Sequence, residues 1–405
     1  MGQHRDGVVI AGAGARGAYE AGARAALLPA LEREGSRPTI LVGTSAGAIN
    51  VVLLAAYADQ PADVAATALT DFWRGLRCHD IWRPLLRSAP GTLARYSAEF
   101  LGLPRPRLVA LLDTAPLLAT ARRWQAVADR AHANVRAGIV RSLAVATTDV
   151  YRGRTVVFVD LADGEPLPPT DLTRAIDYVP TPLDVAHVLA SAAIPVAFPA
   201  IALPHPAGRR WYADGGVRLN TPLKPAIALG ADRLTVVATH PEIPVDPDEP
   251  APDDLQPEVD DQLVNVLDTV LVDRMVEDLK TLRTVNRALA QAGPSAVEPA
   301  PSPEPDRRLR EIPYVFVGPE RRATLGALAG EVFGDLPLLE RLRPKSCAAD
   351  LGLIRRLLAS GEGPRADDPL SYLFFHPAFA EAAIDLGARD AAALPGPGDG
   401  MPWTR

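Results

Sequence analysis

Residues 40–58 combine three short patterns that constrain how this part of the chain folds. An apolar run at 40–42 precedes Gly43-Thr44-Ser45-Ala46-Gly47, and a helical pattern follows at 48–58. Small residues two positions either side of a serine suit a sharp strand-to-helix turn, which brings neighbouring backbone close and exposes the hydroxyl at the helix start. The sequence therefore predicts a nucleophile elbow in which Gly43 and Gly47 flank Ser45. A glycine-rich helix cap is the alternative interpretation.

The strand before Ser45 is one of several apolar runs that alternate with longer helical patterns. These runs lack the polar alternation of a half-exposed strand, which is typical of strands covered on both faces. Residues 17–34 have helical spacing, so residues 7–43 form a predicted βαβ unit. We expect an α/β fold: three-layer α/β/α with a mostly parallel central sheet, plus a helical C-terminal extension. The predicted strands are residues 7–11, 40–43, 142–146, 156–159, 234–239 and 312–317.

The composition changes after residue 240. Residues 241–261 are rich in Pro, Asp and Glu and contain no Lys or Arg, which is typical of a solvated loop. Apolar residues then recur at steps of three and four from Leu263 to Leu289. This spacing predicts a long amphipathic helix, packed on the core or used as a lid or membrane-facing element, with a Pro-rich break after it. The predicted division is a catalytic domain at 1–240, this insertion at 241–310, and a small α/β extension packed on the catalytic domain at 311–405.

A glycine-rich motif, Gly12-Ala13-Gly14-Ala15-Arg16-Gly17, follows the first predicted strand and opens a helix. Its backbone N–H groups should converge where an anion could bind. The same pattern is the dinucleotide-binding fingerprint, but that function needs an acidic residue at the end of the second strand, where Ser45 lies instead. Parallel neighbouring strands place the motif beside Ser45. The N–H groups of Ala13 and Gly14, with that of Ala46 as a further candidate, could then stabilise the oxyanion of a tetrahedral intermediate.

Ser45 needs a base, because an unassisted hydroxyl is a poor nucleophile at neutral pH. Asp214-Gly215-Gly216 follows a predicted hairpin strand at 210–213. Two glycines allow a tight turn that points the carboxylate into a site, although Asp-Gly is also an ordinary turn sequence. Asp214 is therefore the candidate base, with Gly215 and Gly216 as its supporting turn.

These three motifs, in this order, resemble the patatin-like phospholipase family. The resemblance covers roughly residues 7–240 and includes Ala190-Ser191-Ala192-Ala193-Ile194-Pro195 with Phe198-Pro199, upstream of Asp214. Residues 371–373 and 377–379 are similar to the C-terminal part of some bacterial members. One departure is Ala13, where the family usually has glycine. Alanine is tolerable there unless the backbone needs a positive φ.

The resemblance implies a lipid acyl hydrolase of the phospholipase A or lysophospholipase type, with a Ser45–Asp214 dyad and no histidine. Asp214 would accept the Ser45 proton and return it to the leaving alcohol, and water would then deacylate the enzyme. Because an ordinary aspartate is a weak base, the dyad requires a desolvated Asp214. Arg16 would orient the oxyanion loop or meet a phosphate headgroup, unless it is only a surface arginine at a helix start. The implied oxyanion-hole residues are Gly12, Ala13, Gly14, Arg16 and Gly17.

Three other functions remain open at this point. A Ser-His-Asp α/β-hydrolase would use His240, at the end of a predicted strand, as its base; the chain order fits, but Ser45 follows only the second strand. An acyltransferase would pass the same acyl group to an acceptor other than water. A non-catalytic lipid-binding or regulatory protein would keep the fold without turnover, which the intact Ser45 and Asp214 disfavour.

Charge and composition limit the classes of molecule that this protein is expected to bind. The formal net charge is -7 and no basic stripe stands out, so we expect no nucleic-acid partner. The expected partner is a lipid or acyl-ester substrate, with peripheral membrane contact as a further option, and neither a cofactor nor a metal is expected. The N-terminal apolar block is too short for a secretory signal, which favours a cytoplasmic protein. Cys78 and Cys347 form no metal-ligand pattern and are expected to be reduced or buried thiols, with a disulfide between them as an alternative that no sequence pattern supports.

Overall fold

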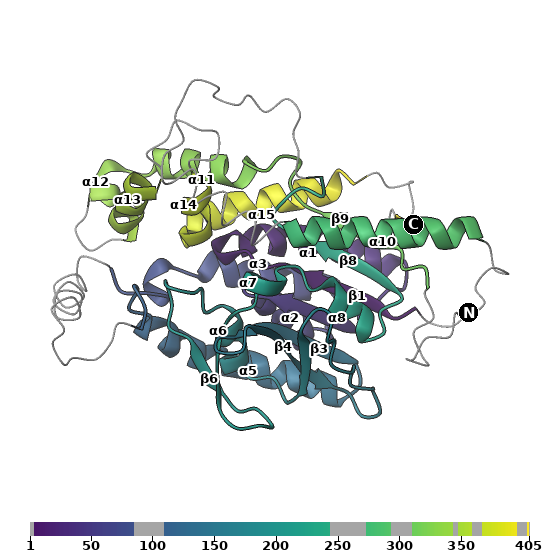
Figure 1. Cartoon of the computed structure of the whole chain (residues 1–405). Helices are drawn as coiled ribbons and strands as arrows, with labels where there is room; N and C mark the ends of the chain where they lie inside the picture. Colours follow the sequence, from purple (N-terminus) through teal and green to yellow (C-terminus); the bar gives the residue numbers. More distant parts are fainter. Residues whose placement is uncertain are drawn as a thin grey trace, which may run out of the picture.

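The computed structural model describes residues 4–84, 109–243, 273–292, 310–342, 347–358, 367–394 and 403–404. Within these residues a mostly parallel mixed sheet lies between two layers of helices, and further helices follow in the C-terminal part (Figure 1). This arrangement confirms the predicted fold class.

The sheet has the strand order β5-β4-β3-β2-β1-β8-β9, and β7 joins it beside β3. Pairing is parallel from β3 through β2, β1 and β8 to β9, whereas β4 and β7 run antiparallel to β3. Short strands β5 and β6, which were not predicted from the sequence, complete it. The strands are β1 (Asp6–Ile10), β2 (Ile40–Thr44), β3 (Ser142–Asp149), β4 (Arg154–Leu161), β5 (Ile176–Pro180), β6 (Ile201–Leu203), β7 (Arg210–Asp214), β8 (Arg233–Val237) and β9 (Tyr314–Val317).

Both faces of the sheet are covered, because alternate residues of each central strand enter different apolar clusters. On β1, Val8 and Ile10 pack with one set of helices, and Val9 and Ala11 pack on the opposite side. The first set is α1 (Gly17–Arg33), α2 (Ala46–Ala56), α3 (Ala62–Gly75), α5 (Ala115–Arg136) and α6 (Val185–Ser191). The opposite face is covered by α7 (Gly216–Leu219), α8 (Leu223–Ala228) and α10 (Asp273–Ala292).

The described part of the predicted amphipathic helix is α10, which packs on the sheet. Its Met275, Leu279 and Leu282 are buried in the same cluster as the strands. The side chain of Asn286 bonds both backbone groups of Ile312, at 2.8 and 3.0 Å, and so links α10 to the segment before β9. The first residues of the predicted helix, most of the acidic loop and the Pro-rich break lie outside the described residues.

The C-terminal part contacts the N-terminal part at several places. Strand β9 extends the sheet beside β8, and α15 (Pro377–Ala392) packs along α1 (Figure 1). Between them lie α11 (Thr324–Asp335), α12 (Leu338–Leu342), α13 (Cys347–Leu358) and α14 (Asp368–Leu373). The proposed domain boundaries stay a prediction, although these contacts join residues after 311 to the sheet that carries Ser45.

Cys78 is buried and disulfide-bonded, so the expectation of a reduced thiol is wrong for this residue. No helix in the described ranges combines the length and apolar character needed to cross a membrane.

Candidate active site

Ser45 occupies a strained turn between β2 and α2. Its backbone has φ 54° and ψ −122°, in a region that side-chain-bearing residues rarely adopt. The turn leaves no room for side chains at the two neighbouring glycines. A Cβ on Gly43 would collide with the carbonyl of Gly47, and one on Gly47 would collide with the carbonyls of Ile10 and Ala11. These contacts explain why the motif needs glycine at both positions.

The sheet brings Asp214 to this turn from far along the chain. Thr44 on β2 pairs with Ala146 on β3, and the next β3 residue, Thr147, pairs with Asp214 on β7. The Ser45 hydroxyl donates to Asp214 Oδ2 at 2.6 Å. A carboxylate within this distance is positioned to accept the hydroxyl proton.

The environment of Asp214 makes it a stronger base than an ordinary aspartate. Only 6% of Asp214 and 5% of Ser45 is exposed. Burial raises the pKa of Asp214 to about 6, against the lowering effect of hydrogen bonds from the Ser45 hydroxyl and the Gly216 N–H. That N–H donates to Oδ1 at 2.7 Å and orients the carboxylate. Gly215 approaches the carbonyl of Ala146 too closely for a side chain, which accounts for glycine at position 215.

The Gly12–Gly17 segment lies against Ser45, as the parallel pairing of β1 and β2 requires. A Cβ on Gly12 would lie 3.3 Å from Ser45 Cβ and would collide with Oδ1 of Asn220. Ala13 has φ −144°, which alanine adopts without strain. Gly14 has φ 55°, in the left-handed region that favours glycine. Within the described part of the chain, the N–H groups of Ala13 and Gly14 donate to no protein acceptor.

Arg16 is completely buried, which excludes the surface-arginine interpretation and direct contact with a headgroup in this conformation. Its guanidinium donates to Oδ1 of Asp368 at 2.7 Å and to Oγ of Ser371 at 2.6 Å. It also lies 4.0 Å from the ring centroid of Tyr372. Arg16 thus ties the glycine-rich loop to α14. Gly17, at the start of α1, leaves no room for a side chain beside Trp73 and Ala46.

Two residues at the site were not predicted as site residues from the sequence. Ser191 accepts a hydrogen bond from the Ser45 N–H at 2.8 Å and donates to the carbonyl of Ala146 at 2.6 Å, so it holds the elbow against β3. Asn220 accepts from the Gly12 N–H through its backbone oxygen at 3.0 Å. Ser191 lies in the stretch that carries the family resemblance, but no spacing rule shows which atoms it contacts.

His240 has a different partner from the one a triad requires. Its Nε2 lies 2.9 Å from the hydroxyl of Tyr372, whereas the Ser45 hydroxyl donates to Asp214. Burial, together with the charges of Arg16 and Arg322, lowers the pKa of His240 well below its ordinary value. Among the described residues, no group of three or more His, Cys, Asp or Glu side chains could hold a metal ion.

The family model for patatin-like phospholipase matches residues 8–227, which is more than half of the chain. Among solved structures, the crystal structure of VipD from Legionella pneumophila is similar at 13% sequence identity and a TM-score of 0.29. The comparison covers 78% of this chain and 62% of that one, less than two thirds of its length. A TM-score this low adds nothing to the assignment. No curated protein matches the chain.

Proposed function

The chain belongs to the patatin-like phospholipase family, and on that premise we propose that it hydrolyses carboxylic esters of lipids through a Ser45–Asp214 dyad. The observation that carries the proposal is the 2.6 Å hydrogen bond from the Ser45 hydroxyl to a buried carboxylate, at a strained turn facing a glycine-rich loop. No histidine takes part.

In the first half-reaction, Ser45 Oγ attacks the ester carbonyl carbon while its proton moves to Asp214 Oδ2. The carbonyl oxygen becomes an oxyanion, which the N–H groups of Ala13 and Gly14 stabilise; one such donor is typically worth about 3 kcal/mol. The intermediate then collapses, the bond to the leaving oxygen breaks, and Asp214 returns the proton to the departing alcohol. An acyl-Ser45 ester remains.

In the second half-reaction, Asp214 takes a proton from a water molecule, which attacks the acyl-Ser45 carbonyl. A second oxyanion forms at the same N–H groups. Its collapse breaks the bond to Ser45 Oγ, Asp214 returns the proton to that oxygen, and the carboxylic acid leaves. A raised pKa suits this double role, because the carboxyl group must accept and release a proton near neutral pH.

Exposed apolar side chains beside β7 support the proposed peripheral membrane contact. Tyr151, after β3, is 81% exposed, and Trp211, on β7 itself, is 48% exposed. The N–H of Val150 donates to the carbonyl of Trp211 at 3.0 Å, which places these segments side by side. Aromatic side chains of this kind suit a membrane interface.

The test is covalent labelling with a fluorophosphonate, together with hydrolysis of phospholipids, lysophospholipids and p-nitrophenyl esters. Wild type should be labelled on Ser45 and should release free acid, and Ser45→Ala should lose both properties while keeping its circular dichroism spectrum. Ser142→Ala is the matched control: it removes another buried hydroxyl, at the far end of β3, and should change neither. Turnover that persists in Ser45→Ala would refute the assignment. Acyl transfer to an added alcohol in place of free acid would favour an acyltransferase.

A further inference from the structure

Arg24 on α1 is a buried guanidinium for which no hydrogen bond or ion pair is found within the described ranges. It is 1% exposed, and its Nε and Nη1 have no hydrogen-bond partner among the described residues. The charge of Asp6 acts on Arg24 at longer range, but the Asp6 carboxylate is already bound by Arg233 and the hydroxyl of Ser36. Burial lowers the pKa of Arg24 to about 10, so the side chain remains protonated at neutral pH. An uncompensated buried charge destabilises a fold, which makes such a group a candidate for ligand binding.

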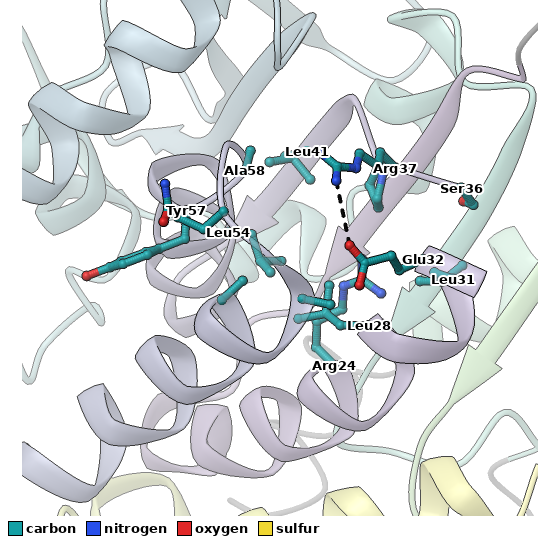
Figure 2. A pocket seen from close by; sticks show the side chains of 14 residues that line it. Arg24, Leu28, Leu31, Glu32, Ser36, Arg37, Leu41, Leu54, Tyr57 and Ala58 are labelled. Atoms are coloured by element: carbon teal, nitrogen blue, oxygen red, sulfur yellow. Dashed lines mark ion pairs between the residues drawn. The ribbon is translucent and has the colours of Figure 1, made fainter. Parts of the chain in front are cut away.

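Arg24 lines a cavity of about 70 Å³ between α1, α2, α3 and the start of β2. Figure 2 shows Arg24 and Leu28 on one side of this cavity and Leu54 on another. Most of the lining is apolar, and it consists of Leu28, Leu31, Pro38, Leu41, Leu54, Tyr57, Ala58, Ala62 and Ala65. The cavity therefore combines a buried positive charge with a mostly apolar lining.

The side chains that line the cavity carry a net formal charge of +1. Besides Arg24, the charged lining residues are Arg37 and Glu32, whose side chains are exposed and lie 3.6 Å apart as an ion pair. These two largely balance each other, so the charge of Arg24 remains. A ligand with a single negative charge would complement it.

The available donors select the head group of that ligand. Ser36 already donates to Asp6, and the Gln60 amide donates to Asp59 at 3.0 Å. Arg24 is therefore the main source of unused N–H groups, and a planar guanidinium matches a carboxylate with two parallel hydrogen bonds. Phosphate and sulfate are tetrahedral, so their oxygens would need hydrogen-bond donors from several directions and not from one guanidinium plane alone. At about 10–15 Å³ for each water-sized sphere, the cavity holds roughly five to seven such groups.

We propose that this cavity binds a small monocarboxylate with a short alkyl chain, its carboxylate on Arg24 and its chain against the leucines of α1, α2 and β2. The site is separate from Ser45. Ser45 precedes the first residue of α2, whereas Leu54 and Tyr57 lie at the other end, and a helix of 11 residues spans about 16 Å. The proposal therefore does not depend on the proposed ester hydrolysis.

Calorimetric titration of the full chain with butanoate tests the proposal. Butanoate should bind with one-to-one stoichiometry, and butanamide, which has nearly the same shape but no charge, should bind at least about tenfold more weakly. Arg24→Met keeps the length of the side chain and should weaken butanoate binding by at least about tenfold. Arg33→Gln is the matched control, because it removes an exposed charge from the same helix outside the cavity and should leave the affinity unchanged.

A second variant keeps the proposal testable if Arg24→Met does not fold. Ala58→Phe fills the cavity with Arg24 intact and should also abolish binding. Arg24→Met should melt no lower than wild type, because it removes an unpaired buried charge. Absence of butanoate binding to wild type, equal affinity for butanamide, or undiminished binding in either variant would overturn the proposal. Tighter binding of inorganic phosphate than of butanoate would overturn the assigned ligand class.

Discussion

The pH dependence of ester hydrolysis tests whether a buried Asp214 with a raised pKa is the base. Burial raises the pKa of Asp214 to about 6 from the ordinary 3.8. At a pKa of about 6, roughly nine tenths of Asp214 would be ionised at pH 7 and about one tenth at pH 5. Since only the ionised carboxylate accepts the Ser45 proton, kcat/KM should fall about tenfold between these two pH values.

An aspartate at its ordinary pKa would behave differently. It would still be about nine tenths ionised at pH 5, so kcat/KM would change by less than about 10% over the same interval. The assay is hydrolysis of a p-nitrophenyl ester in samples quenched at pH 9 before the absorbance is read. Circular dichroism at pH 5 verifies that the protein remains folded there.

His240→Ala provides the control. His240 faces Tyr372 and not Ser45, so its removal should change kcat by less than about tenfold and leave the acidic limb in place. A flat profile between pH 5 and pH 7, or an acidic limb that disappears in His240→Ala, would refute the argument that Asp214 is the base.

Three further predictions concern two variants at the site. Asp214→Asn should reduce kcat to near background, because asparagine cannot accept the proton. The same variant should be more stable than wild type at pH 7. A carboxyl whose pKa is raised in the folded state contributes stability only below its unfolded value, and the loss as pH rises from 3.8 to about 6 amounts to at most about 3 kcal/mol. Urea denaturation should therefore show the gain at pH 7 and little at pH 4; an equal gain at both would contradict this reasoning. Gly47→Ala should destabilise the protein by about 1–3 kcal/mol, because its Cβ meets two backbone carbonyls, whereas Gly75→Ala, with open space around it, should not. Thermal melting of the two alanine variants checks this, and equal melting temperatures would show that the elbow can relax.

The local patterns were informative about the fold because they depend on short-range physics. Uninterrupted apolar runs predicted the central strands, and the turn at Gly43-Thr44-Ser45-Ala46-Gly47 lies between a strand and a helix as expected. Strands β5 and β6 were not predicted, since each is short and its pairing with β4 or β7 is set by the tertiary structure.

The sequence by itself determined the strand-to-helix turn that carries Ser45 and singled out the candidate site residues, because a glycine-flanked turn is a local property. Only the tertiary structure decided what surrounds them. Register across β2, β3 and β7 sets the distance from Ser45 to Asp214, although 169 positions separate the two in the chain. The burial of Arg16 against Asp368, and the lack of a hydrogen-bond partner for Nε and Nη1 of Arg24 among the described residues, likewise arise from packing between segments distant in sequence. Both arginines are buried, so the groups that packing places beside each guanidinium decide whether it is half of an ion pair or an unpaired cation.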